Sequence, residues 1–286
     1  MSAVAAAHGW TGPGQLGASP LVFDSPHSSR HWPDWATPPQ VSTAALDSGW
    51  DAWVDEIWAQ ACGGRSPVLA AHFHRACLDA NRPRDDIDQD LLDAPWPGPV
   101  QASSACQRGM GLIRRLALPG QPLYAQPLQV AEVQQRIQAL YDPYHQALHE
   151  MVLAAHQRWG QVLHLNVHSM KSVGNAMNVD SGQARPDLVL SNLNGQTCDP
   201  ALLAELGARL QALGFRVQLN EPYQGNECIR RHAHPAQGRH SVQIELKRAL
   251  YMDETTLRRH AGFDELVGRL QAFVQGLEQD KPWRRA

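Results

Sequence analysis

The sequence lacks several features that mark broad classes of protein. No run approaches the roughly 20 consecutive apolar residues that a membrane-spanning helix needs. Residues 1–7 lack the basic start and long apolar stretch of a signal peptide. Lysines and arginines form no run, and the formal net charge is only −3, which gives no sign of a nucleic-acid partner. These absences predict a cytoplasmic protein that binds neither membranes nor nucleic acids.

Paired cysteines and the common nucleotide motifs are also missing. The five cysteines are scattered and form no CxxC pair, which argues against a disulfide framework or a cysteine zinc cluster. No Walker A loop, GxGxxG or GxSxG element occurs. Nucleotide-binding and serine-hydrolase functions therefore have no support in the sequence.

What the chain does contain is a series of short apolar runs that alternate with helical patterns. Hydrophobic residues make up 43% of its 286 residues, enough for a substantial core. The apolar runs predict strands at 21–24, 68–73, 162–170, 187–190, 215–219 and 241–246. Helical spacing predicts helices from near Ser42 and over 51–61, 129–159, 200–213 and 257–277, with a break at Pro143. Together they predict an α/β fold in which a mixed central sheet is covered by helices on both faces.

The pattern divides the chain into a lead-in and one domain. Residues 1–19 are rich in alanine and glycine and predict a poorly ordered lead-in. Residues 20–286 predict a single α/β domain. Within it, residues 83–128 hold many prolines, glycines and aspartates and little periodicity, so we expect them to pass over the active face.

Two histidines stand where predicted strands end. His168 closes the run 162–170, and His27 directly follows the strand at 21–24; a serine comes next in both cases. In an open α/β sheet, ligands bind at the carboxyl ends of the strands. The pair is therefore predicted to ligate one metal ion. The alternative is that each histidine only makes a hydrogen bond within its loop.

A hydrolytic zinc site needs a third protein ligand and an open position for water. Asp51 is the strongest candidate because it begins a predicted helix just after the His27 loop. Asp47, Asp55 and Glu56 are local competitors. The alternative for Asp51 is a carboxylate that only stabilises the first turn of that helix.

Glu245 is the predicted general base. Alternation in the strand 241–246 places it opposite the apolar side chains. A carboxylate within a central strand is costly unless it is solvated or paired, and activating a metal-bound water is a good reason to keep one. The alternative is an edge strand on which Glu245 pairs with Lys247 or Arg248.

Arginines after the second predicted strand indicate an acidic substrate. Asn81 and Arg82 offer an amide and a guanidinium side by side, and arginine grips a carboxylate through two parallel hydrogen bonds. Arg75 lies close upstream and is placed to polarise a carbonyl. The alternative for each arginine is a solvated surface residue.

A second histidine pattern is predicted to be structural. His145 and His149 have the HxxxH spacing that places two imidazoles on one helix face, but Gln146 stands where a zincin needs its glutamate base.

Together these elements resemble the N-formylglutamate amidohydrolase family, itself similar to the zinc carboxypeptidases and aspartoacylase. The resemblance runs from about residue 21 to residue 254. It is carried by the order and spacing of residues 24–28, Arg75 with 79–83, 166–170, 195–198, 220–225 with Arg230, and 243–254. The sequence departs from the family pattern at Asn226 and Glu227, where relatives often carry another glycine, and at His74, where a serine is common.

The resemblance implies a three-layer, zinc-carboxypeptidase-like fold and a role for each residue. His27, Asp51 and His168 match the metal-binding positions, and Glu245 matches the general base.

The remaining implied roles concern the substrate. Arg75 matches the arginine that polarises the substrate carbonyl, Asn81 and Arg82 match the carboxylate-binding pair, and Arg230 is a candidate clamp for a second carboxylate.

The expected activity is zinc-dependent hydrolysis of N-formyl-L-glutamate, a step that the resemblance links to histidine breakdown. Two alternatives stay open. One is the same chemistry on another acidic N-acyl amino acid or a small peptide. The other is a metal-stabilised protein that binds acidic metabolites without turnover.

Overall fold

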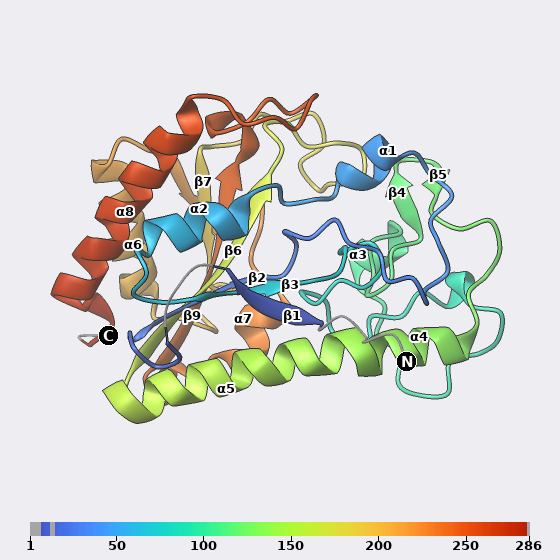
Figure 1. Cartoon of the computed structure of the whole chain (residues 1–286), viewed down its shortest axis with the longest axis horizontal. Coiled ribbons are helices and arrows are strands. Elements are labelled where there is room, and N and C mark those ends of the chain that lie inside the picture. The colour runs from blue at the N-terminus through green and yellow to red at the C-terminus, as the bar shows by residue number, and fades with distance from the viewer. Residues whose placement is uncertain (1–6, 12–14, 285–286) are drawn as a thin grey trace.

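The computed structural model describes residues 7–11 and 15–284. Its main sheet has seven strands: β1 (His8–Thr11), β2 (Leu21–Ser25), β3 (Val68–Ala71), β6 (Val162–Met170), β7 (Leu188–Ser191), β8 (Val217–Leu219) and β9 (Arg239–Lys247). A small hairpin pairs β4 (Leu116–Leu118) with β5 (Gln121–Pro122). The helices are α1 (Thr43–Asp47), α2 (Val54–Ala61), α3 (Ser104–Gln107), α4 (Val130–Arg136), α5 (Asp142–Trp159), α6 (Pro200–Ala212), α7 (Glu227–His232) and α8 (Gly262–Asp280) (Figure 1).

The sheet is mixed, as predicted. Its order is β1-β3-β2-β6-β9-β7-β8. Strands β3, β2, β6 and β9 run parallel to one another, whereas β1 is antiparallel to β3 and β7 is antiparallel to β9. Strand β9 is therefore central. Every residue of β6 is buried, as is every residue of β9 except the two at its ends.

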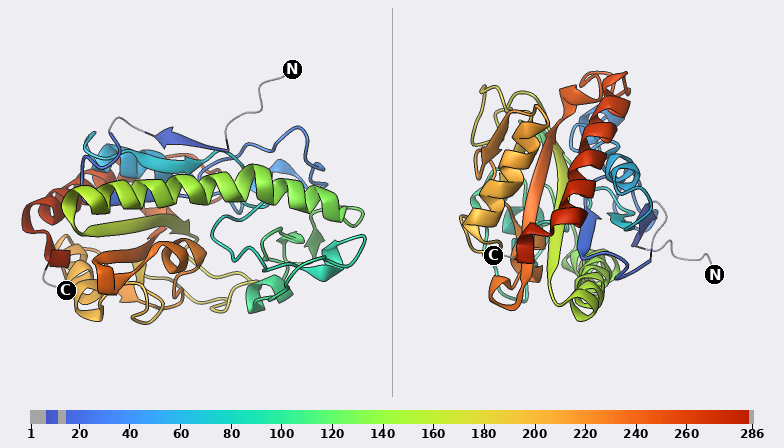
Figure 2. Two further views of the ribbon diagram at one scale, coloured as in Figure 1. Left: turned by 90° about the horizontal axis from the view of Figure 1, so that it is seen from below. Right: turned by 90° about the vertical axis from the view of Figure 1, so that its left-hand side faces the viewer.

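The two faces of the sheet differ in chemistry. On one face, alternate residues of β6 such as Leu163, Leu165 and Val167 pack with apolar side chains of α2, α6 and α8. The opposite face is covered by α5 and α7, and there β6 presents polar residues (His164, Asn166 and His168), all buried. Figure 2 shows α5 running along one side of the sheet and α8 along another. The predicted helical cover on both faces is confirmed.

The predicted break at Pro143 is wrong. Helices α4 and α5 join through a wider turn, Ile137–Tyr141, into one rod (Figure 1). In that turn the Asp142 N–H bonds to the Ile137 carbonyl, five residues back. Proline lacks an N–H and needs extra room for its ring. The wide turn just before Pro143 supplies that room, so the helix continues.

Two predicted helices begin later than expected. Helix α2 starts at Val54 rather than residue 51 because Trp53 has a left-handed backbone with φ of 65°. Helix α8 starts at Gly262 rather than residue 257, and Leu257 has φ of 57°. A residue in that region cannot continue a right-handed helix. Asp51 consequently lies before α2 and not in its first turn.

Strand β1 is an element that the sequence analysis did not predict. It lies inside the predicted lead-in and pairs with β3, His8 opposite Ala71. The division into a lead-in over 1–19 and a single domain over 20–286 stays a prediction. Among the helices of the described residues, none is long and apolar enough to cross a membrane.

Candidate metal centre

A cavity of about 540 Å³ opens at the carboxyl ends of the parallel strands. Six of the predicted site residues line it: His27, Arg75, Asn81, Arg82, His168 and Glu245. Asp51 lies in the wall between this cavity and a smaller one of about 100 Å³. The segment 83–128 passes over the site as predicted, because five of its residues contribute to the lining: Ser104, Ala105, Arg108, Met110 and Arg114.

The register of the sheet places His168 beside Glu245. Strands β6 and β9 pair in parallel with His168 opposite Glu245 and Asn166 opposite Gln243. Side chains two residues apart on a strand share a face. All four therefore point to the same polar side of the sheet.

The three predicted metal ligands, His27, Asp51 and His168, lie close together. The Asp51 Oδ2 atom lies 3.1 Å from His168 Nδ1 and 3.3 Å from His27 Nδ1. One ligand atom from each residue lies within 4.8 Å of the others, and all three residues are buried. This group could hold a metal ion.

The hydrogen bonds of the two rings show that the donors fit a cation. His27 Nε2 lies 2.7 Å from Asp79 Oδ1 and His168 Nε2 lies 2.7 Å from Asn166 Oδ1, which is the arrangement that a hydrogen on each Nε2 would satisfy. Both Nδ1 atoms face a carboxylate oxygen of Asp51, and His27 Nδ1 is buried without a hydrogen-bond partner among the described residues. A divalent metal ion satisfies such a set of two imidazoles and one carboxylate.

The second oxygen of Asp51 is held by arginines. Its Oδ1 accepts from Arg248 Nη2 at 3.1 Å and lies 3.7 Å from Arg75 Nη1. Burial alone would raise the pKa of the Asp51 carboxyl, but contacts with His168 and His27 and the charge of Arg75 hold it well below its usual value. Asp51 is therefore an anion in the folded protein.

Glu245 has no ion-pair partner among the described residues. Lys247 pairs with Asp187 and Arg248 pairs with Asp51, so the expected alternative of a partner on an edge strand does not occur. Glu245 accepts one hydrogen bond, from Gln243 Nε2 at 3.0 Å. Burial raises the pKa of its carboxyl, as does the charge of Asp51, although His168 opposes them. A carboxyl group in this setting can both accept and release a proton.

Asn81 is fixed in the wall of the cavity. Its side chain donates to Gln243 Oε1 at 3.1 Å and accepts from the Cys228 N–H at 2.9 Å. Beside it, the Arg82 guanidinium has a buried Nε without a hydrogen-bond partner among the described residues. Arg75 is paired instead, with Nη2 2.8 Å from Asp79 Oδ2. Asn81 and Arg82 therefore lie side by side in the wall, and Arg82 has no carboxylate partner in the part of the chain that the structure describes.

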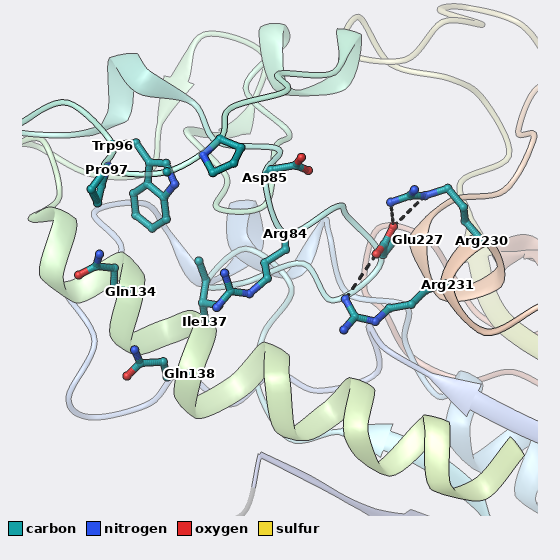
Figure 3. A pocket seen from close by; sticks show the side chains of 12 residues that line it. Arg84, Asp85, Trp96, Pro97, Gln134, Ile137, Gln138, Glu227, Arg230 and Arg231 are labelled. Atoms are coloured by element: carbon teal, nitrogen blue, oxygen red, sulfur yellow. Dashed lines mark hydrogen bonds and ion pairs between the residues drawn. The ribbon is translucent and has the colours of Figure 1, made fainter. Parts of the chain in front are cut away.

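Arg230 is the one predicted site residue that the structure does not bring to this cavity. It lines a separate pocket of about 510 Å³, and 56% of its side chain is exposed. Figure 3 shows its guanidinium turned toward Glu227 in that pocket, and its Nε donates to Glu227 Oε2 at 3.0 Å. The Arg230 side chain extends back along α7 to Glu227, and its role as a carboxylate clamp stays a prediction. Asn226, before the helix, lines the active cavity, whereas Arg230 one turn later does not.

The other acidic residues considered as third ligand, and the histidine of the HxxxH pattern, have partners outside the metal centre. Asp47 binds Arg30, Asp55 binds Thr11 and Glu56 binds Arg259. His145 bonds to His232 at 3.0 Å and to the Ala80 carbonyl oxygen at 2.9 Å. A buried ring with both nitrogens used in this way is structural, as predicted.

Sequence reasoning missed the residues that orient the ligands. Asp79, Asn166 and Gln243 were assigned no role, yet each bonds to a predicted site residue. The available signal was the alternation in β6 and β9, where Asn166 precedes His168 by two residues and Gln243 precedes Glu245 by two. No comparable signal singled out Asp79.

Asp24 bonds to Asn166, which in turn contacts the predicted ligand His168. Its Oδ1 accepts from His164 at 2.7 Å and from Asn166 Nδ2 at 2.9 Å, and its Oδ2 accepts from the Tyr144 hydroxyl at 2.7 Å. Burial acts to raise the pKa of this carboxyl, but the contacts with His164, Tyr144 and Asn166 outweigh it and lower the pKa from 3.8 to about 2. The ionised form is stabilised in the folded protein.

This shift predicts an acid-dependent loss of stability. Because the folded pKa lies below the unfolded one, the contribution of Asp24 is complete above about pH 5 and is lost as the pH falls toward about 2. We expect Asp24→Asn to lower the free energy of unfolding at pH 7 by on the order of 2 kcal/mol. Urea unfolding at pH 7 and pH 3 measures this difference, which should narrow at pH 3. A difference that is the same at both pH values would contradict the assignment.

The chain matches the family model for N-formylglutamate amidohydrolase over residues 19–252. It is 28% identical over 242 residues to the N-formylglutamate deformylase of Pseudomonas putida, which covers 84% of this chain and 84% of that protein. A solved structure of N-formylglutamate amidohydrolase from Ralstonia eutropha JMP134 is 38% identical, with a TM-score of 0.88 over 98% of this chain and 99% of that one. A gene product of Agrobacterium tumefaciens that is 20% identical shares the fold, with a TM-score of 0.67 over 96% of each chain.

Proposed function

Because the chain belongs to the N-formylglutamate amidohydrolase family, we propose that it cleaves N-formyl-L-glutamate to formate and L-glutamate with a bound zinc ion. The family membership predicted from the sequence motifs is thereby confirmed. The observation that carries the proposed chemistry is the placement of Glu245 beside His168, in register on neighbouring strands, with His27 and Asp51 completing a group of metal donors.

The zinc ion would be held by Nδ1 of His27, Nδ1 of His168 and a carboxylate oxygen of Asp51. When bound, zinc lowers the pKa of a water molecule and polarises the substrate carbonyl. Asp79 and Asn166 hold the opposite ring nitrogens, which fixes the direction of both imidazoles.

Glu245 acts as the general base and then as the general acid. It takes a proton from water as the water oxygen bonds to the formyl carbon. It then gives that proton to the amide nitrogen as the C–N bond breaks, so formate and the free amine leave. Its burial, its single hydrogen bond from Gln243 and the absence of an ion pair with any described residue leave its second oxygen free for this transfer.

The arginines of the cavity position the substrate. Arg75 binds the formyl oxygen as negative charge develops on it, and its ion pairs with Asp79 and Asp51 hold the guanidinium in place. Asn81 and Arg82 bind the α-carboxylate of the substrate. With both ends of the scissile group held, the amide carbon faces the attacking water.

A substrate comparison tests the proposed function. We expect the purified protein with zinc to release formate from N-formyl-L-glutamate with kcat/KM above about 10⁴ M⁻¹ s⁻¹. N-Acetyl-L-glutamate and a glutamyl dipeptide are assayed as alternative substrates, to test whether the protein is a broader amidohydrolase. Removal of the metal with a chelator should abolish formate release, and added zinc should restore it.

Two results would contradict the proposal. Faster cleavage of the acetyl compound or of the dipeptide would show that formyl is not the preferred acyl group. Tight binding of L-glutamate without hydrolysis of any of the three compounds, zinc present, would favour a binding protein for acidic metabolites.

A further inference from the structure

The active cavity contains more arginine than the protein neutralises. Four arginines line it: Arg75, Arg82, Arg108 and Arg114. Arg75 pairs with Asp79 and Asp51. None of the other three has a carboxylate partner within 4.0 Å among residues 7–11 and 15–284, although Arg108 donates to the Met177 carbonyl oxygen at 2.8 Å.

Arg114 is the most buried of these three cations. It is only 9% exposed, and its Nε is buried without a hydrogen-bond partner in the described part of the chain. Burial and the repulsion of Arg75 lower the pKa of its guanidinium to about 9. An arginine that is buried without an anion destabilises the folded protein. A cation in this position therefore indicates that a ligand supplies the missing negative charge.

Other buried arginines of this fold are fully occupied. Arg136 binds Glu132, the Tyr124 hydroxyl and the Cys77 carbonyl oxygen. Arg185 makes two hydrogen bonds to Asp180, at 2.7 and 2.8 Å.

Arg248 is likewise occupied, by Ser169, Asp51 and the Ser48 carbonyl oxygen. The fold thus provides partners for its structural arginines, and Arg114 is an exception that faces the cavity.

Arg114 and the Asn81–Arg82 pair line different parts of the cavity. Asn81 Nδ2 lies 3.2 Å from His168 Nε2, so the Asn81–Arg82 pair adjoins the metal ligands. Arg114 also lines the smaller adjoining cavity, which neither Asn81 nor Arg82 lines. The α-carboxylate is attached one carbon from the scissile nitrogen, whereas the γ-carboxylate is two methylene groups further along the side chain.

We propose that Arg114 binds the γ-carboxylate of the substrate and thereby selects an acidic side chain, while Asn81 and Arg82 bind the α-carboxylate. This inference rests on the proposed function for the identity of the substrate. It assigns to Arg114 the role that the sequence motifs suggested for Arg230. Of the three arginines without a carboxylate partner among the described residues, Arg82 and Arg114 also have a buried Nε without a hydrogen-bond partner, and these two match the two carboxylates of N-formylglutamate.

Three substrates separate the two carboxylate sites. N-Formyl-L-glutamine keeps the shape of the side chain but has no γ charge, and N-formyl-4-aminobutanoate keeps the distal carboxylate but has no α-carboxylate. We expect the parent enzyme to prefer N-formyl-L-glutamate over N-formyl-L-glutamine by on the order of 100-fold or more in kcat/KM, because the neutral analogue leaves the buried cation unpaired.

Arg114→Met should reduce that preference to less than about 10-fold, and it should impair N-formyl-4-aminobutanoate more than N-formyl-L-glutamine. Arg82→Met should instead impair hydrolysis of N-formyl-L-glutamine more than that of N-formyl-4-aminobutanoate. Arg115→Met is the matched control, because Arg115 pairs with Asp88 at 2.6 Å and lies outside the cavity lining; it should keep the parental preference. Arg114→Lys keeps the charge and should give an intermediate preference, which covers the case in which the methionine variant folds poorly.

Ligand binding supplies a readout that does not depend on catalysis. L-Glutamate should raise the melting temperature of the parent protein more than L-glutamine does, and Arg114→Met should remove this difference while leaving the unliganded protein at least as stable as the parent. The inference would be overturned if Arg114→Met lowered kcat/KM equally for all three substrates and L-glutamate still raised its melting temperature more than L-glutamine does. Absence of hydrolysis by the parent would refute the proposed function instead, and the thermal difference would still decide the role of Arg114.

Discussion

Replacement of Glu245 by glutamine should lower kcat for N-formyl-L-glutamate by about 10²–10⁴-fold, the contribution expected of a positioned general acid–base. Glutamine keeps the size of the side chain and can still contact Gln243, which lies 3.0 Å from Glu245 in the parent. It cannot accept the proton of the attacking water. The metal donors His27, Asp51 and His168 are untouched, so zinc content should stay at the parental value.

The measurement is steady-state formate release together with metal analysis of the same preparation. Glu205→Gln is the matched control: Glu205 pairs with Arg209 on α6, outside the cavity lining, and its side chain is 35% exposed. We expect that variant to keep full activity. Parental activity in Glu245→Gln would remove Glu245 from the mechanism.

Replacement of Asp51 by alanine should abolish stoichiometric zinc binding and destabilise the protein. The substitution removes one of the three donors, and it leaves Arg248 without the carboxylate that lies 3.1 Å away. Loss of one partner of a buried ion pair typically costs about 3–5 kcal/mol. We therefore expect a fall of that order in the free energy of unfolding, even in chelator.

Metal analysis after dialysis and urea unfolding in the presence of a chelator measure the two effects separately. Asp47→Ala is the matched control, because Asp47 lies four residues upstream and pairs with Arg30, whose side chain is 51% exposed. An ion pair that is exposed on one side contributes at most about 1 kcal/mol, and Asp47→Ala should retain zinc. Full zinc in Asp51→Ala would show that the third ligand is another group.

Much of the fold followed from local pattern. Apolar runs and helical spacing predicted the mixed sheet and its helical cover, and the exceptions have local causes that composition does not reveal. The helix that contains Pro143 continues because a wider turn precedes the proline, and α2 starts late because Trp53 takes a left-handed backbone. Such backbone choices depend on packing around the residue as well as on its identity.

The candidate site was predictable where its residues stand at the ends of strands. His27 and His168 each follow or close an apolar run, and Glu245 stands out as a carboxylate in a strand. Asp79, which holds His27, and Arg248, which holds Asp51, had no such signal, because their partners lie 52 and 197 residues away in the chain. Only folding brings these pairs together.

By itself, the sequence determined the type of fold, the family and the chemical kinds of side chain at the site, because strand periodicity and motif spacing are local properties of the chain. The tertiary structure alone decided which of these residues meet. The parallel register of β6 and β9 sets His168 beside Glu245. The path of α7 carries Arg230 out to Glu227, whereas the loop over the site leaves Arg114 buried at the cavity without a counter-ion among the described residues. Charge balance in a buried cavity depends on distances across the fold, and the order of residues does not contain those distances.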